Sequence, residues 1–143
     1  MNQDFVDLLR AFVDADVRFM VVGAYALALH GRPRATGDLD IWIDATPENA
    51  RRIMQALGAF GAPLAEISEQ DFARPGVVYQ IGVAPGRIDL LTELSGLTFA
   101  EAWADRVHSP FGAIKVDFIG RDSFIRNKRA VGRAKDLGDI DGL

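Results

Sequence analysis

Two apolar segments on either side of a glycine constrain the fold of this chain more than any other feature of its sequence. The first, Phe19–Val22, runs into Gly23 and an alanine- and leucine-rich stretch, and the second follows at Leu39–Ile43. Asp38 and Asp40 stand one residue apart at the start of the second segment. In an extended strand, residues two apart share a face, so these carboxylates converge while their neighbours face the core. The pattern predicts a cation site at the beginning of a buried strand.

The acidic pair and the preceding glycine together indicate nucleotide chemistry. Two carboxylates a few ångströms apart repel each other and raise each other's pKa unless a cation offsets their charge. Mg²⁺ binds one or two carboxylates together with phosphate oxygens of a substrate. Gly23 permits close approach of the backbone, and a helix that begins near Ala24 points unpaired N–H groups at an anion. We therefore expect a metal site beside a phosphate-binding turn.

Composition narrows the class of protein. The 143 residues, 49% of them apolar, suffice for one core, so a single domain over residues 1–143 is expected. A net charge of −4 argues against a general nucleic-acid binder, although a local basic patch could still bind RNA. The absence of cysteine excludes disulfides and thiolate metal sites. No targeting segment and no membrane-spanning stretch is recognised, so a soluble cytoplasmic protein is expected.

Hydrophobic periodicity and turn residues predict alternating helices and strands. Apolar residues recur at intervals of three and four between positions 4 and 15, which predicts an amphipathic helix. The turn Gly82–Gly86 separates Val77–Ile81 from Arg87–Leu91, which predicts a strand pair. Thr46 and Pro47 suit the start of a helix that runs to about Leu57. The other predicted elements are strands at 19–22 and 39–43, an edge strand at 114–118, and helices at 24–30, 98–107, 123–131 and 135–140.

Three motifs resemble those of one enzyme superfamily. They are Gly23-Ala24-Tyr25-Ala26, the segment His30–Trp42 with its Asp-Leu-Asp, and the basic segment Asn127–Leu137. Together they resemble the nucleotidyltransferase superfamily of the minimal kind found in bacterial toxin–antitoxin systems, in particular the toxin of AbiEii-type abortive-infection systems. The resemblance covers roughly residues 19 to 140. It implies an α/β (α+β) fold with a small mixed sheet of about four or five strands, helices packed on one face and the acidic cluster on the other.

The resemblance also implies a reaction and the residues that perform it. Such enzymes move an NMP from a nucleoside triphosphate to a hydroxyl with Mg²⁺ or Mn²⁺; the acceptor expected here is a tRNA or a protein, and a cognate toxin or antitoxin is an expected partner. In these enzymes a third carboxylate lies on a neighbouring strand. The expected catalytic and metal-binding residues are Asp38, Asp40 and Asp89, and the expected nucleotide-binding residues are Gly23, Ala24, Arg34, Thr36, Lys128 and Lys135.

Side-chain chemistry supports several of these roles. An unpaired buried carboxylate at Asp89 is costly, so pairing with a cation is expected. Arg34, in the loop before the acidic pair, presents a rigid fork suited to phosphate oxygens. Lys128 and Lys135 are seven residues apart, a spacing that predicts a shared helix face. Asp44 is expected to serve a turn or a helix cap rather than the site.

Two other functions remain open at this point. Ala24 stands where larger members of the superfamily have a serine whose hydroxyl binds a phosphate oxygen. The change favours, as an alternative, a catalytically inactive nucleotidyltransferase fold that binds a nucleotide or a protein partner. A metal-dependent phosphohydrolase is a weaker alternative, because such enzymes normally add histidine ligands and only His30 and His108 are present.

Overall fold

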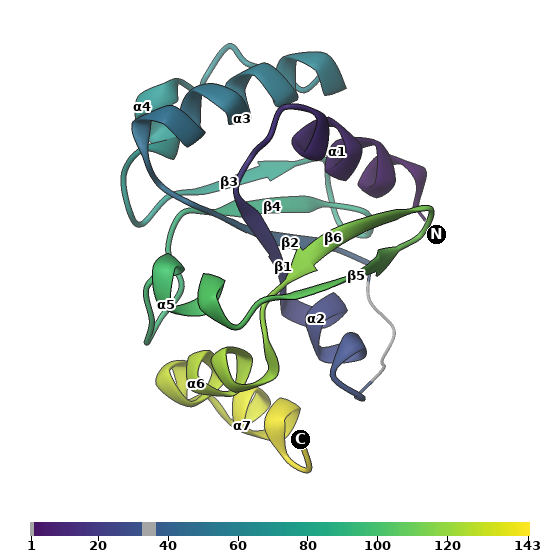
Figure 1. The fold of residues 1–143 in the computed structure, drawn as a ribbon, viewed down its shortest axis with the longest axis vertical. Coiled ribbons are helices and arrows are strands. Elements are labelled where there is room, and N and C mark those ends of the chain that lie inside the picture. Colours follow the sequence, from purple (N-terminus) through teal and green to yellow (C-terminus); the bar gives the residue numbers. More distant parts are fainter. Residues whose placement is uncertain (1, 33–36) are drawn as a thin grey trace.

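The computed structural model describes residues 2–32 and 37–143, and these build a mixed sheet with helices on both sides (Figure 1). The strands lie in the order β3-β4-β2-β1-β6-β5. The elements, in chain order, are α1 (Gln3–Asp14), β1 (Phe19–Val22), α2 (Gly23–Leu29), β2 (Leu39–Ile43), α3 (Pro47–Phe60), α4 (Glu69–Phe72), β3 (Val78–Ile81), β4 (Ile88–Leu91), α5 (Phe99–Ala104), β5 (Val107–Phe111), β6 (Ile114–Phe118), α6 (Arg121–Val131) and α7 (Ala134–Ile140).

The register of the central strands sets the two faces of the sheet. β2 pairs antiparallel with β1 and parallel with β4. Val22, Asp40 and Asp89 are register partners across these three strands, so their side chains share one face. Alternate residues of β2, among them Ile41 and Ile43, are fully buried on the other face. A strand with one apolar face and one acidic face therefore stands in the middle of the sheet.

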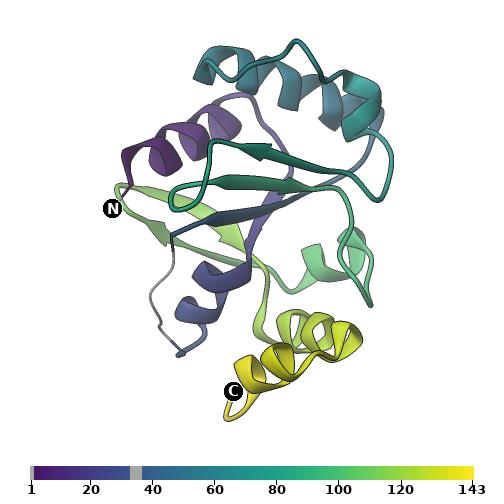
Figure 2. The same cartoon turned by 180° about the vertical axis from the view of Figure 1, so that it is seen from behind.

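Helices α1 and α3 form the layer over the apolar face, and Figures 1 and 2 show them together on one side of the molecule. The α1 side chains spaced by three and four are buried, and the ring of Phe12 packs 5.4 Å from that of Phe19 on β1. Thr46 caps α3 by accepting from the backbone N–H of Asn49, and Gly61 ends it in the left-handed conformation. Core packing thus stabilises α1, and local capping fixes both ends of α3.

The acidic face is partly covered by α5 and by the C-terminal pair α6 and α7 (Figure 2). Trp42 of β2 packs edge-on against Phe99 of α5, with ring centroids 5.2 Å apart. Phe99 in turn stacks on Trp103. These contacts fill the half of the acidic face that lies toward the end of β2, and they leave its beginning, at Asp40, next to α6.

Among residues 2–32 and 37–143, none of the helices has both the length and the hydrophobicity that a membrane span requires.

The predicted fold class is confirmed, with local corrections. Helices lie on both faces of the sheet, not on one face as predicted, because α5, α6 and α7 partly cover the acidic face. The sheet has six strands, one more than the upper number predicted, because Val107–Phe111 forms β5. The helix predicted to reach Val107 therefore ends at Ala104. Ile114–Phe118 was predicted as an edge strand, but β6 lies between β1 and β5. β5 escaped prediction because Pro110 lies inside it, and proline is tolerated at this sheet edge.

Candidate active site

Asp40 and Asp89 form the centre of the candidate site. They are direct register partners on the parallel strands β2 and β4. The carboxyl of Asp89 is almost fully buried, and that of Asp40 is half-buried. Burial, the charge of Asp89 and a hydrogen bond with it, and the charge of Asp38 raise the pKa of Asp40 to about 6, and the charge of Lys128 acts in the opposite direction. The positive charge of Lys128 therefore offsets the effects that raise the pKa of Asp40 only in part.

Asp38 approaches the pair from the end of the loop before β2. Its Oδ1 accepts a hydrogen bond of 3.0 Å from the backbone N–H of Arg87. The same pairing of β2 with β4 that aligns Asp40 and Asp89 brings this backbone N–H to Asp38. All three predicted carboxylates therefore lie near the start of β2 and β4.

Arg87 is a site residue that the sequence analysis did not single out. Its Nε and Nη2 donate to Oδ1 and Oδ2 of Asp89 at 2.8 and 3.2 Å, and its Nη2 lies 3.6 Å from Oδ2 of Asp38. Hydrogen bonding to Asp89 raises the pKa of Arg87. The available signal was the spacing: on a strand, residues two apart share a face, so Arg87 and Asp89 had to be neighbours.

Gly23 lies against the acidic pair, as the glycine turn predicts. Its φ is 68°, a left-handed conformation that favours glycine. A Cβ at this position would lie 2.2 Å from Oδ2 of Asp40, so only a residue without a side chain fits there. Because the turn at the end of β1 touches the carboxylate at the start of β2, backbone and carboxylate border the same space.

A cavity of about 260 Å³ opens beside these residues, between the sheet and the C-terminal helices. Gly23 and Asp40 line one side of it, and Lys128 and Arg133 line the other. The other lining residues are partly apolar and partly polar, and among them Asn127 is held by a 3.0 Å hydrogen bond from its Nδ2 to the carbonyl of Ser95. Acidic and basic side chains therefore face each other across this cavity.

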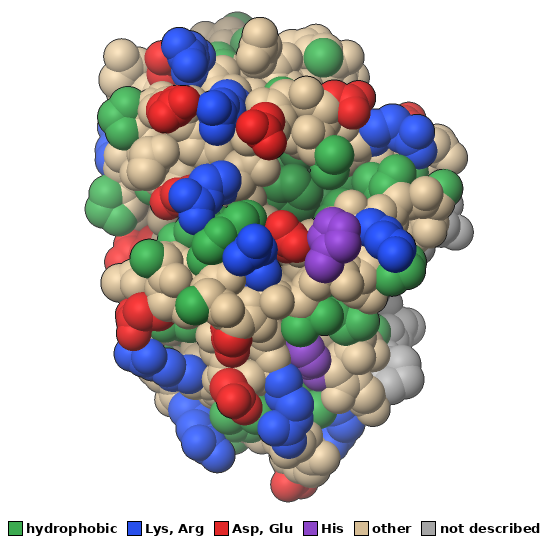
Figure 3. Space-filling model, viewed as in Figure 1, with side chains coloured by type: hydrophobic (Ala, Val, Ile, Leu, Met, Phe, Trp, Pro, Cys, Tyr) green, Lys and Arg blue, Asp and Glu red, His purple; other side chains and the backbone are tan. Residues whose placement is uncertain are grey.

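Lys128 is fixed in place by two buried carboxylates of α7. Its Nζ lies 3.5 Å from Oδ1 of Asp136 and 3.7 Å from Oδ2 of Asp139. Arg133 also donates to Asp136, at 2.6 Å, and this hydrogen bond lowers the pKa of Asp136 to about 2. Figure 3 shows Lys and Arg side chains on the outer surface of the C-terminal helices, whereas the side chain of Lys128 is only 16% exposed and lines the cavity.

Lys135 does not join the site. α6 ends at Val131, Gly132 adopts the left-handed conformation, and a new helix begins at Ala134. The prediction that Lys128 and Lys135 share a helix face was therefore wrong, because this break in the chain separates the two lysines. Lys135 is exposed and does not line the cavity.

Of the remaining predicted nucleotide-binding residues, Ala24 follows Gly23 in the first turn of α2 but does not line the cavity. Arg34 and Thr36 lie outside the described residues.

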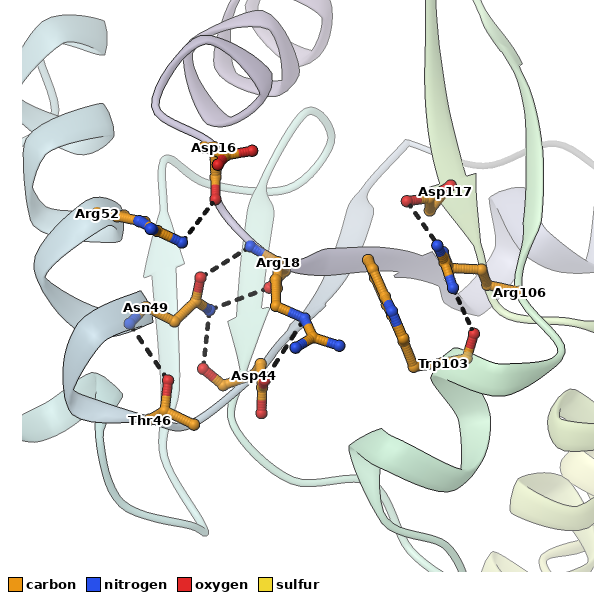
Figure 4. A network of polar contacts seen from close by, with 9 residues as sticks. All are labelled: Asp16, Arg18, Asp44, Thr46, Asn49, Arg52, Trp103, Arg106 and Asp117. Atoms are coloured by element: carbon orange, nitrogen blue, oxygen red, sulfur yellow. Dashed lines mark hydrogen bonds and ion pairs between the residues drawn. The ribbon is translucent and has the colours of Figure 1, made fainter.

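Asp44, the third aspartate in the alternation, lies at the far end of β2 in a separate network (Figure 4). Its carboxylate is 3.8 Å from Nε of Arg18, and its carbonyl accepts from the side chain of Asn49. Arg18 also lies over the ring of Trp103, 4.7 Å from its centroid, with Arg106 at 3.8 Å. This network stabilises the fold, and the expected turn role of Asp44 agrees with it.

The donor chemistry of the site suits a hard divalent cation. Asp38, Asp40 and Asp89 offer only carboxylate oxygens, which Mg²⁺ and Mn²⁺ prefer, and the raised pKa of Asp40 is what a bound cation would lower. Among residues 2–32 and 37–143, no three acidic or histidine side chains are gathered as a ready ligand set. The guanidinium of Arg87 contacts Asp38 and Asp89 at this point.

Comparison with known proteins supports the architecture. No protein-family model matches the sequence, and a search of curated proteins found no match. Among solved structures, the fold is similar to that of a "putative nucleotidyltransferase" from Thermotoga maritima. The TM-score is 0.60 and the sequence identity 14%, and the match covers 99% of this chain and 89% of that chain. The chain therefore has the fold of that protein.

Proposed function

We propose that this chain is a metal-dependent nucleotidyltransferase that moves an NMP from a nucleoside triphosphate to a hydroxyl of a tRNA or a protein. The observation that carries the proposal is the contact of Gly23 with Asp40, in register with Asp89. It joins a backbone turn that can approach phosphates to carboxylates that can hold a cation. The resemblance to AbiEii-type toxins adds a toxin–antitoxin role, with a cognate partner protein, to the proposal.

The cavity supports a position for the triphosphate. Its volume of about 260 Å³ is less than the roughly 300–1,000 Å³ of typical ligand pockets. We therefore place the phosphate tail inside, between Gly23 and the cationic groups of Lys128 and Arg133, and the nucleoside outside. Lys128 is a point charge suited to phosphate oxygens, and its two buried carboxylate partners hold it there.

The proposed reaction is an in-line displacement at the α-phosphorus. The acceptor oxygen forms a bond to this phosphorus as the bond to the bridging oxygen of the β-phosphate breaks, and pyrophosphate leaves. Mg²⁺ or Mn²⁺ held by Asp38, Asp40 and Asp89 would supply charge neutralisation and lower the pKa of the acceptor hydroxyl. In this proposal Asp89 accepts the hydroxyl proton, and Lys128 neutralises charge on the leaving group.

One observation favours the alternative of an inactive binding partner. Arg87 already neutralises Asp38 and Asp89, and Ala24 offers no hydroxyl to a phosphate. Such a chain would bind a nucleotide or a protein partner without transferring anything.

Label transfer separates the two functions. Purified protein is incubated with each α-³²P-labelled nucleoside triphosphate, Mg²⁺ or Mn²⁺, and total tRNA or cell protein. We expect label in one acceptor class, and its loss in Asp40→Asn and Asp89→Asn. Asp44→Asn is the matched control, because it removes a carboxylate just after the same strand without touching the site. Nucleotide binding without transfer would support the inactive partner instead.

A further inference from the structure

We propose that Arg87 occupies the place of the divalent cation between Asp38 and Asp89, and that it leaves this place when the cation binds. The inference rests on the proposed metal site and adds to it a built-in competitor. The proposal concerns Asp38 and Asp89, the two carboxylates that the guanidinium of Arg87 joins.

The contacts of the guanidinium carry the first step. Arg87 uses two nitrogens on the two oxygens of Asp89, at 2.8 and 3.2 Å, and Nη2 also lies 3.6 Å from Oδ2 of Asp38. The two oxygens of Asp89 accept hydrogen bonds from the guanidinium and so present these lone pairs to the arginine rather than to a metal, whereas the 3.6 Å approach to Asp38 is an ion pair. Both ligands on this side of the site are therefore engaged by the same side chain.

The burial of Asp89 explains why a positively charged group, either Arg87 or a metal ion, must always lie beside it. The side chain of Asp89 is only 11% exposed, and an ionised carboxylate with so little solvent is strongly destabilising without a positive partner. Arg87 supplies that partner from two residues away on the same face of the strand. In the absence of metal, Arg87 therefore serves as the positive partner of this buried carboxyl group.

The position of Arg87 permits its departure. Its side chain is 30% exposed, so the guanidinium can turn toward water while its backbone stays in place. The backbone N–H of Arg87 still donates to Oδ1 of Asp38 at 3.0 Å after such a turn, because this bond involves no side-chain atom of Arg87. The exchange replaces one cation by another and leaves Asp38 oriented.

Mn²⁺ binding, followed by the EPR signal of the free ion, tests the exchange without any reference to activity. We expect Arg87→Gln to bind Mn²⁺ about tenfold more tightly than the wild type, because it lacks the competing charge. Arg87→Lys, which keeps a charge but cannot form the two-nitrogen fork, should fall between them. Arg126→Gln is the matched control: it removes an arginine paired at 2.9 Å with Glu101, outside the site, and should leave the affinity unchanged.

Several outcomes would overturn the exchange. Equal affinity in Arg87→Gln and the wild type would show that Arg87 does not compete, and weaker binding would show that it supports the ligands instead. If neither the wild type nor any variant binds Mn²⁺, the metal site itself is overturned. Asp40→Asn tests that site separately. Thermal unfolding in EDTA identifies a variant that fails to fold. If Arg87→Gln fails to fold, the Mn²⁺ affinity of Arg87→Lys compared with that of the wild type decides whether Arg87 competes with the cation.

Discussion

A Cβ on residue 23 would lie 2.2 Å from Oδ2 of Asp40, so the turn after β1 and the first acidic residue of β2 can exist together only because residue 23 is glycine. Two segments that are 17 positions apart in the sequence therefore meet in one contact. The contact ties a backbone turn to the carboxylate with the raised pKa.

Gly23→Ala should damage both stability and the site. The left-handed φ alone costs a residue with a side chain roughly 1–3 kcal/mol, and the overlap with Asp40 adds to this cost. Gly61→Ala is the control, because Gly61 also has positive φ but an added Cβ meets nothing within 4 Å. Urea unfolding should show a larger loss for Gly23→Ala, and only that variant should lose transfer. Equal losses in the two variants would mean that the contact with Asp40 is unimportant.

Asp40 should make the metal-free protein less stable as the pH rises. The folded state holds the Asp40 proton until about pH 6, whereas the unfolded chain releases it near 3.8. Stability is therefore lost between about pH 4 and pH 6 and stays constant above. In EDTA at pH 7, Asp40→Asn should exceed the wild type by about 3 kcal/mol in unfolding free energy, and the gap should shrink toward pH 4. A gap that does not change with pH would contradict the assignment.

Replacing Lys128 should matter, whereas replacing Lys135 should not. Lys128→Gln removes a positive partner of two buried carboxylates, at a cost of roughly 3 kcal/mol, and takes a charge out of the cavity. Nucleoside triphosphate affinity, measured by calorimetry at a temperature where both proteins are folded, should fall roughly tenfold to a hundredfold. Lys135→Gln should match the wild type in both measurements. A comparable fall in affinity for Lys135→Gln would mean that Lys135 binds the nucleotide, as the sequence analysis expected.

Local patterns in the sequence predicted much of the fold. β2 was predicted with the bounds that it has, because its apolar and acidic residues alternate with the period of a strand. The hairpin of β3 and β4 followed from the turn between two apolar segments. Gly23 was recognised because a glycine between a strand and a helix has few other uses.

Features that depend on contacts between distant segments were not predicted. The clamp of Arg87 across Asp38 and Asp89 requires the register of β2 against β4, which no local pattern contains. The helices predicted at 123–131 and 135–140 already separated Lys128 from Lys135, but the spacing of the two lysines does not show how the left-handed turn at Gly132 orients one helix against the other. α3 passes through Gly58 and ends only at Gly61, since its buried face outweighs the low helix propensity of one glycine.

The central claim is that this site transfers a nucleotidyl group through Asp40. The most direct measurement compares transfer from a nucleoside triphosphate labelled at the α-phosphate with transfer from one labelled at the γ-phosphate, in the wild type and in Asp40→Asn. We expect α-label in the acceptor, no γ-label, and a loss of at least about a hundredfold in Asp40→Asn. Transfer of γ-label, absence of α-label from every acceptor, or undiminished transfer by Asp40→Asn would contradict the claim.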